Sequence, residues 1–137
     1  MREILFRGKR VDNGKWVEGS FCMDATEQLN GVKKSADGFI RRFNPETCRM
    51  DMFEVDRETV GQFTRLTDRN STKIFEGDIV NYNGEPGYVG FDKENAEFLI
   101  FFSKWTAGFD SIYCDRNAEV IGNIYDNPNL LEVSEND

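Results

Sequence analysis

The segment DIVNYNGEPGYVGFDKENAEFLIFF, residues 78–102, carries the clearest structural signal in this 137-residue chain. Three apolar stretches within it, 78–82, 88–91 and 96–102, are rich in β-branched and aromatic side chains and are separated by Asn, Gly and Asp. Short runs of this composition predict strands, because branched and aromatic side chains pack well on a pleated sheet. Asn83-Gly84 favours a tight hairpin, since both residues tolerate positive φ. We therefore expect an antiparallel meander here.

The same rhythm continues on both sides of this segment. Residues 109–113 and 119–124 predict two more strands, and Leu130-Leu131 predicts a short helical turn. Five strands at about ten-residue spacing are typical of a small antiparallel barrel or sandwich. On the N-terminal side we expect strands at 3–7, 15–21, 39–43, 50–55 and 59–63, a hairpin turn at Asn13-Gly14, and one helical turn at 25–29.

Charge divides the chain unevenly. Seventeen Lys and Arg stand against 25 Asp and Glu, a net charge of −8. Residues 1–60 hold eleven basic and eleven acidic side chains, whereas residues 61–137 hold six basic and fourteen acidic ones. We interpret residues 1–60 as an N-terminal β-rich part, 61–132 as a barrel-like part and 133–137 as an acidic tail. A single compact unit is the alternative.

The chain contains no histidine, which removes several classes of catalysis. There is no Ser-His-Asp or Cys-His pair, no HExxH zinc site and no His-ligated iron or copper. None of the seven lysines has an acidic residue two positions before it, so the Glu/Asp-x-Lys signature of a magnesium nuclease is absent. Cys22, Cys48 and Cys114 form no CxxC motif and are expected as reduced thiols. The sequence nominates no catalytic, cofactor-binding or metal-binding residue.

Neither a membrane span nor a leader is expected. No stretch approaches the ~18–20 consecutive apolar residues of a transmembrane helix. The start, Met1-Arg2-Glu3-Ile4, opens no apolar signal-peptide region. We expect a cytoplasmic protein without membrane contact.

Four basic residues lie close together in the otherwise balanced N-terminal part: Lys33, Lys34, Arg41 and Arg42. They are the candidate residues for binding a partner, either an anion or an acidic surface of a protein. The plainer interpretation, ordinary solvated side chains on a loop and a hairpin, stays open. The acidic later part is a poor candidate for nucleic acid, because such proteins normally carry a basic footprint.

Three blocks together resemble the YopX family of phage and prophage proteins. They are MREILFR at 1–7, VGQFTRLTDRN at 60–70 with IFEGDIV at 74–80, and EVIGNIYDNP at 119–128 with Leu130-Leu131. The resemblance covers the whole chain and implies a mainly β protein whose later part is an SH3-like barrel or roll. It also implies a phage or prophage gene product in the bacterial cytoplasm. It implies no activity, and no catalytic or ligand residue carries over from it.

Individual residues of these blocks have structural interpretations. We expect Gly77 to adopt positive φ, Asp78 to bind a nearby amide, and Gly122 to permit a bend or a close backbone approach. The chain departs from the family pattern at two positions that bear on local turn geometry. Arg65 stands where the family often has glycine, and Ser71 where an Asn-Gly turn is common.

The overall expectation is a mainly β chain with at most short helices. A hairpin-rich, irregular N-terminal part would pack on a C-terminal SH3-like small barrel or roll. The first functional hypothesis is a non-enzymatic protein-interaction module whose partner is a host protein or a second copy of the chain. The alternative is a nucleic-acid-associated module that uses the basic cluster at 33–42. The third, less favoured, is a carboxylate- or metal-dependent enzyme.

Overall fold

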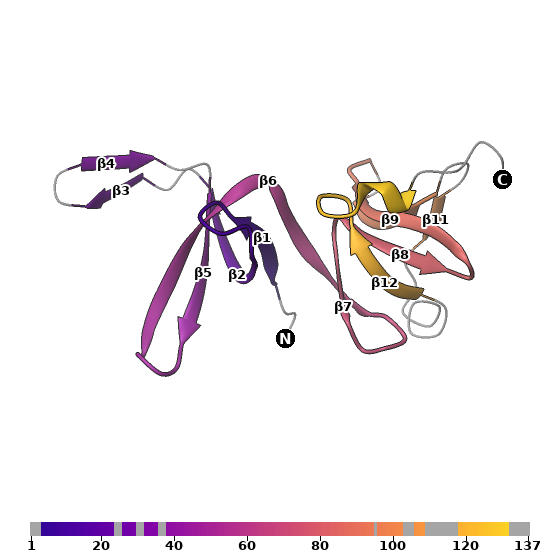
Figure 1. Ribbon diagram of the computed structural model, residues 1–137, viewed down its shortest axis with the longest axis horizontal. Coiled ribbons are helices and arrows are strands. Elements are labelled where there is room, and N and C mark those ends of the chain that lie inside the picture. Colours follow the sequence, from indigo (N-terminus) through magenta and orange to yellow (C-terminus); the bar gives the residue numbers. More distant parts are fainter. Residues whose placement is uncertain are drawn as a thin grey trace. The chain divides into compact units, whose positions relative to one another are not determined.

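The computed structural model describes residues 4–23, 26–29, 32–35, 38–94, 96–102, 106–108 and 118–131, and these form a mainly β protein (Figure 1). The first strands are β1 (Phe6–Arg10), β2 (Trp16–Met23), β3 (Thr26–Leu29), β4 (Val32–Ser35), β5 (Gly38–Asn44) and β6 (Arg49–Thr67). The later elements are β7 (Lys73–Phe75), β8 (Asp78–Tyr82), β9 (Glu85–Asp92), β10 (Glu97–Phe101), β11 (Thr106–Gly108), β12 (Ala118–Asn123) and the 3-10 helix η1 (Pro128–Leu131). The expectation of a mainly β chain with at most short helices is confirmed, since η1 is the one helix within these described ranges.

The chain divides into two compact units, Met1–Gln62 and Phe63–Asp137. Strand β6 contributes residues to each unit. Each unit has its own buried apolar cluster, as expected of a domain with its own core. The acidic tail at 133–137 lies outside the described residues.

In the first unit four strands pair in a closed circuit: β1 with β2, β2 with β5, β5 with β6, and β6 with β1. Strand β2 changes partner along its length, because residues 16–19 pair with β1 and residues 20–23 pair with β5. Gly19 stands at this change, where a Cβ atom would collide with the carbonyl oxygen of Arg41. The core consists of buried Val17, Ile40 and Val55, with Phe6, Phe21, Phe53 and Val60 packed against it.

Strand β6 is longer than the sequence predicts. We expected two strands, 50–55 and 59–63, whereas the structure has one from Arg49 to Thr67. Its pairing with β1 contains a large bulge: β1 advances two residues, from Arg7 to Lys9, while β6 moves five, from Gly61 to Asp56. The Thr59 hydroxyl fills the gap in the ladder, accepting a hydrogen bond from the Lys9 amide at 2.9 Å and donating one to the Asp56 carbonyl at 2.6 Å. A side chain thus replaces a backbone partner where the register breaks.

The second unit contains an antiparallel sheet of strand order β11-β10-β9-β8-β12. Strands β8 and β9 form the expected hairpin, in which Asn83 and Gly84 have φ values of 52° and 91° between the paired residues Tyr82 and Glu85. Positive φ at both positions is the geometry of the type I′ turn. The core of this unit consists of Ile74, Val80, Val89, Ile100, Phe102 and Ala118. The strand expected at 109–113 lies outside the described residues.

Two local predictions were wrong. The first strand is shifted, from the expected 3–7 to Phe6–Arg10, where it gains pairing with both β2 and β6. The helical turn expected at 25–29 is instead strand β3, because Leu29 pairs with Val32 in a hairpin with β4. A single helical turn is expensive to nucleate, whereas a hairpin partner four residues long supplies a ladder of hydrogen bonds.

Candidate functional site

The outer part of the β5–β6 hairpin is a two-stranded ribbon. Strand β2 pairs with β5 over residues 38–41, and β1 pairs with β6 over residues 55–62. Residues 42–44 and 49–51 therefore pair with one another and, in the part of the chain that the structure describes, have no further strand beside them. Figure 1 shows the hairpin reaching past β1 and β2 to its turn. An isolated two-stranded hairpin is marginally stable in water, so this ribbon depends on what covers it.

Local sequence explains how the ribbon ends. The Asn44 side-chain oxygen accepts a hydrogen bond from the Glu46 amide at 3.0 Å, which forms an Asx turn. Pro45 follows and has no amide hydrogen to continue the ladder. Cys48 closes the turn with a φ of 56°. These residues return the chain into β6.

One face of the ribbon is apolar and exposed. The register pairs Arg41 with Met52 and Phe43 with Met50, so these four side chains share one face, which we call the Phe43 face. Phe43 is 57% exposed, Met50 48% and Met52 40%. Three large apolar side chains that share an exposed face form an apolar patch, and the largest such patch on a protein surface is often functional.

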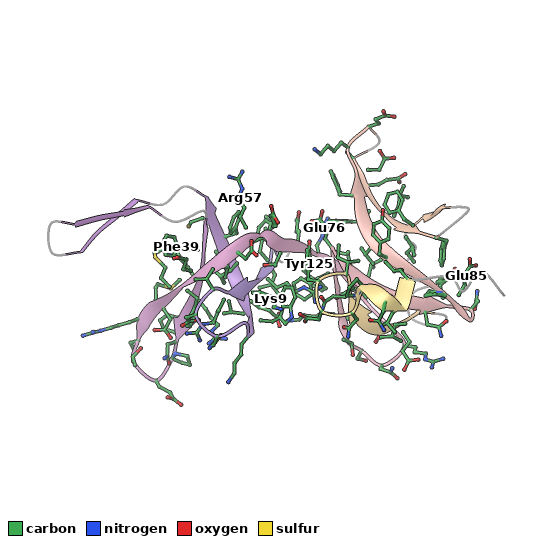
Figure 2. All side chains as sticks on the ribbon, turned by 45° about the horizontal axis from the view of Figure 1, so that its top comes forward. Lys9, Phe39, Arg57, Glu76, Glu85 and Tyr125 are labelled. Carbon is green, nitrogen blue, oxygen red and sulfur yellow. The ribbon has the colours of Figure 1, made fainter. Side chains whose placement is uncertain are left out.

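The opposite face carries its own partners. Arg42 pairs with Asp51 across the strands, and its guanidinium carbon lies 5.4 Å from the centre of the Phe53 ring. The Asn44 side-chain amide donates a hydrogen bond to Asp51 at 3.1 Å. Arg10 also lies over Phe53, at 4.6 Å from its centre. Two arginines stacked on Phe53 and a hydrogen-bonded Asn–Asp pair therefore lie on this second face. Figure 2 shows the side chains of the hairpin, with Phe39 toward its base.

Arg41 differs from Arg42 in this respect. Its side chain is exposed, and among the described residues it forms no ion pair and no ring contact. It lies opposite the half-exposed Met52. The Phe43 face thus combines three apolar side chains with Arg41, and Glu54, two residues after Met52, lies on the same side of β6.

The structure does not bring the four predicted basic residues onto one surface. Arg41 and Arg42 lie on opposite faces of β5. Lys33 and Lys34 lie on β4, in register with Gln28 and Glu27, and their side chains are outside the described part. Sequence reasoning missed Phe43, Met50 and Met52 as surface residues. Alternation along the expected strands 39–43 and 50–55 indicates that Met50 and Met52 share a face of their strand, but neither that Phe43 joins them nor that this face is exposed.

Asp68 and Asp78, two acidic residues of the segment 60–80, have structural roles. Asp68 is 3% exposed, and its Oδ1 accepts hydrogen bonds from the amides of Asn70 and Thr72 at 2.8 and 2.9 Å. Its Oδ2 accepts one from the Val120 amide at 2.8 Å, which ties the 68–72 turn to β12. Asp78, 1% exposed, accepts one from the Phe75 amide at 2.7 Å, as the sequence predicted, and Gly77 has the expected positive φ of 91°. Both carboxylates therefore bind backbone amides.

No group of three or more Cys, Asp or Glu residues within the described ranges is arranged to hold a metal ion. No helix in the same part of the chain has the length and apolar character needed to cross a membrane.

Comparison with known proteins gives a family and a fold. Residues 5–132 match the model of the family described as YopX protein. The chain is similar to the crystal structure of protein EF1440 from Enterococcus faecalis, with a TM-score of 0.56 and 20% sequence identity over 95% of this chain and 99% of that one. A search of curated proteins gave no significant match. The likeness in structure supports the fold alone.

Proposed function

The chain belongs to the YopX family, and we propose that it is a non-enzymatic protein-interaction module that contacts its partner through the Phe43 face. One observation carries this proposal: Phe43, Met50 and Met52 share one face of the β5–β6 hairpin, each at least 40% exposed, and among the described residues no further strand lies beside Phe43 and Met50. Phe, Met and Arg are enriched at protein interfaces, and flexible Met side chains adapt to the surface they meet.

Covering the Phe43 face would supply part of the free energy that binding needs. Full burial of a large apolar side chain contributes roughly 1.5–3 kcal/mol. Since the three side chains are about half exposed, covering them contributes about 3 kcal/mol in all, or on the order of a hundredfold in affinity. Contacts that surround these three side chains would add further binding free energy.

The alternatives have less support. A nucleic-acid-binding module needs several cations on one surface, but Arg41 and Arg42 lie on opposite faces and the net charge is −8. A carboxylate enzyme needs acids free to act on a substrate, whereas Asp68 and Asp78 accept hydrogen bonds from backbone amides. The proposal includes a phage or prophage origin and action in the bacterial cytoplasm, both implied by the sequence resemblance. The SH3-like form of the later part likewise stays a prediction.

Affinity capture with variants of the hairpin tests this function. The full chain, immobilised, is incubated with lysate of bacterial cells, and bound proteins are compared between the wild type and the double variant Phe43→Ser, Met50→Ser. Ile121→Ser is the matched control, because Ile121 is also exposed, at 39%, but lies on β12 in the second unit. We expect a specific protein that the wild type and Ile121→Ser retain and the double variant loses. Equal retention by all three proteins would contradict the proposal.

A further inference from the structure

Two Asn-Gly pairs form exposed turns in the described part of the chain: Asn13-Gly14 between β1 and β2, and Asn83-Gly84 between β8 and β9. Asparagine is a chemically labile residue, and a following glycine increases this lability, because glycine has no Cβ to hinder attack by its own backbone nitrogen. A Cβ on Gly14 or Gly84 would meet no atom within 4 Å. Sequence and exposure therefore do not distinguish the two turns.

The first turn holds both its glycine nitrogen and its asparagine side chain. The Gly14 amide donates a hydrogen bond to the backbone carbonyl of Arg10 at 2.9 Å. The side-chain oxygen of Asn13 accepts a hydrogen bond from the Lys15 amide, also at 2.9 Å. The Arg10 amide in turn donates to the Lys15 carbonyl at 2.9 Å, so hydrogen-bonded backbone on both sides fixes this turn.

The second turn holds its glycine nitrogen through a side chain. The Gly84 amide donates a hydrogen bond to the side-chain oxygen of Asn81 at 2.8 Å. Asn81 is half-buried, and rotation about its side-chain bonds is enough to release the amide. Asn83 is exposed, and no described residue forms a hydrogen bond with its side chain. The nitrogen and the side-chain carbonyl are therefore held less firmly here than in the first turn.

From this difference we propose that Asn83 is a site of spontaneous deamidation, and that Asn81 sets its rate by occupying the Gly84 amide. In the reaction the Gly84 nitrogen loses its proton and attacks the side-chain carbonyl carbon of Asn83. A carbon–nitrogen bond forms, the bond from that carbon to the side-chain nitrogen breaks, and ammonia leaves with the proton. Water then opens the cyclic imide at either carbonyl, which gives aspartate or isoaspartate.

The isoaspartate product would change the β8–β9 hairpin. Asn83 and Gly84 form a two-residue loop between the directly paired residues Tyr82 and Glu85. Isoaspartate places the Cβ atom in the main chain, and one added backbone atom does not fit a two-residue type I′ turn. Since β8 and β9 are neighbours inside the five-stranded sheet, the reaction would weaken the second unit from its turn inward. This inference does not depend on the proposed function.

Peptide mapping of the aged protein tests the proposal. The full chain is incubated in warm, mildly alkaline buffer, and samples taken over time are digested with trypsin and analysed by mass spectrometry. Cleavage after Lys and Arg separates Asn13 (peptide 11–15) from Asn83 (peptide 74–93), and Asn30-Gly31, outside the described residues, falls in a third peptide, 16–33. We expect aspartate and isoaspartate to accumulate faster in peptide 74–93 than in peptide 11–15. Asn83→Gln should remove this signal, which assigns it to Asn83 rather than Asn81.

Two variants of Asn81 test its control of the rate. Asn81→Ala removes the acceptor of the Gly84 amide and should raise the rate in peptide 74–93 about fivefold, the effect of one net hydrogen bond. Asn81→Asp keeps an acceptor oxygen and should react at the wild-type rate. Peptide 11–15 is the internal control, because general unfolding would raise both rates, whereas loss of one hydrogen bond raises only the rate at Asn83.

The same measurement in urea separates the fold from the local sequence. The rates in the two peptides should converge there, since both contain Asn-Gly and the hydrogen bonds of the turns are lost. Three outcomes would each overturn the proposal: reaction at Asn13 as fast as at Asn83 in the folded chain, an Asn81→Ala variant that reacts at the wild-type rate, or a difference between the peptides that persists in urea.

Discussion

Arg41 and Arg42 are consecutive residues that face opposite sides of the β5–β6 hairpin: Arg41 is paired with Met52, whereas Arg42 is paired with Asp51 and lies over Phe53. Adjacent side chains on a strand alternate between faces, so two cations that read as one cluster in the sequence act in different surroundings. Arg42 contacts the ring of Phe53 within the folded chain. Arg41 is exposed and makes no ion pair or ring contact among the described residues.

The Thr59 hydroxyl should be important for stability. Thr59→Val keeps the shape of the side chain but removes the acceptor of the Lys9 amide and the donor to the Asp56 carbonyl. We expect a loss of about 1–3 kcal/mol in the free energy of unfolding, measured by urea denaturation. Thr59→Ser, which keeps the hydroxyl, should lose clearly less. A Thr59→Val variant as stable as the wild type would show that the hydroxyl does not support the irregular pairing of β1 with β6.

Ser71 should be improved by glycine. It has a φ of 64° in the turn held by Asp68, a left-handed conformation that costs a residue with a Cβ roughly 1–2 kcal/mol. Glycine avoids this strain but loses about 0.5–1 kcal/mol through greater freedom of the unfolded chain. We expect Ser71→Gly to raise the free energy of unfolding by about 0.5–1 kcal/mol. Ser71→Ala, which keeps the Cβ, should give no gain, and a gain of equal size would contradict this reasoning.

Asp68→Asn should destabilise the second unit. The amide nitrogen of Asn cannot accept the hydrogen bond that the Val120 amide donates to Asp68 Oδ2. Two donors would then face each other in a buried site, at a cost of about 1–3 kcal/mol measured by thermal or urea unfolding. Glu119→Gln is the control, since Glu119 makes a partly exposed ion pair with Arg69 and should change stability by less than about 1 kcal/mol. An Asp68→Asn variant as stable as the wild type would show that the carboxylate does not hold the turn.

Asp12 should titrate at lower pH than an ordinary aspartate. Hydrogen bonds from the Arg10 guanidinium, at 3.0 and 2.6 Å, and the positive charge of that group hold the pKa of Asp12 below 3.8. Because the folded-state pKa is depressed, any stability this pair contributes is present above the unfolded-state pKa and is lost as the pH falls through the folded-state pKa. In Arg10→Gln the pKa, followed by NMR of the carboxyl carbon, should return toward 3.8. An unchanged titration midpoint would contradict the assignment.

Arg65 and Ser71 have unusual backbone geometry. Arg65 has a φ of 70° at the irregular pairing of β6 with β7, and Ser71 a φ of 64°. Both are positions that the sequence indicates as bearing on local turn geometry. In the structure both have the left-handed conformation that favours glycine or asparagine.

Strand prediction succeeded where the evidence was local. The segment 78–82 is strand β8, and Asn83-Gly84 forms its turn, because composition and turn chemistry act within a few residues. It failed at β3 and β7, and at the continuous β6, whose residues 55–62 pair with β1 about fifty residues earlier in the chain. Thr59 shows the reason, since its hydroxyl completes a ladder with Lys9, fifty residues away.

The sequence by itself determined the mainly β class, the two hairpin turns at Asn13-Gly14 and Asn83-Gly84, and the absence of histidine chemistry, because each depends on residue types and short spacings. Because successive side chains of a strand point to opposite faces, the sequence also places Ile40 and Phe43 on different faces of β5. Only the tertiary structure decided that Ile40 is buried and Phe43 exposed. Burial of a strand face depends on which other strands lie against it, and β2 and β1 end their pairing before the ribbon reaches Phe43 and Met50.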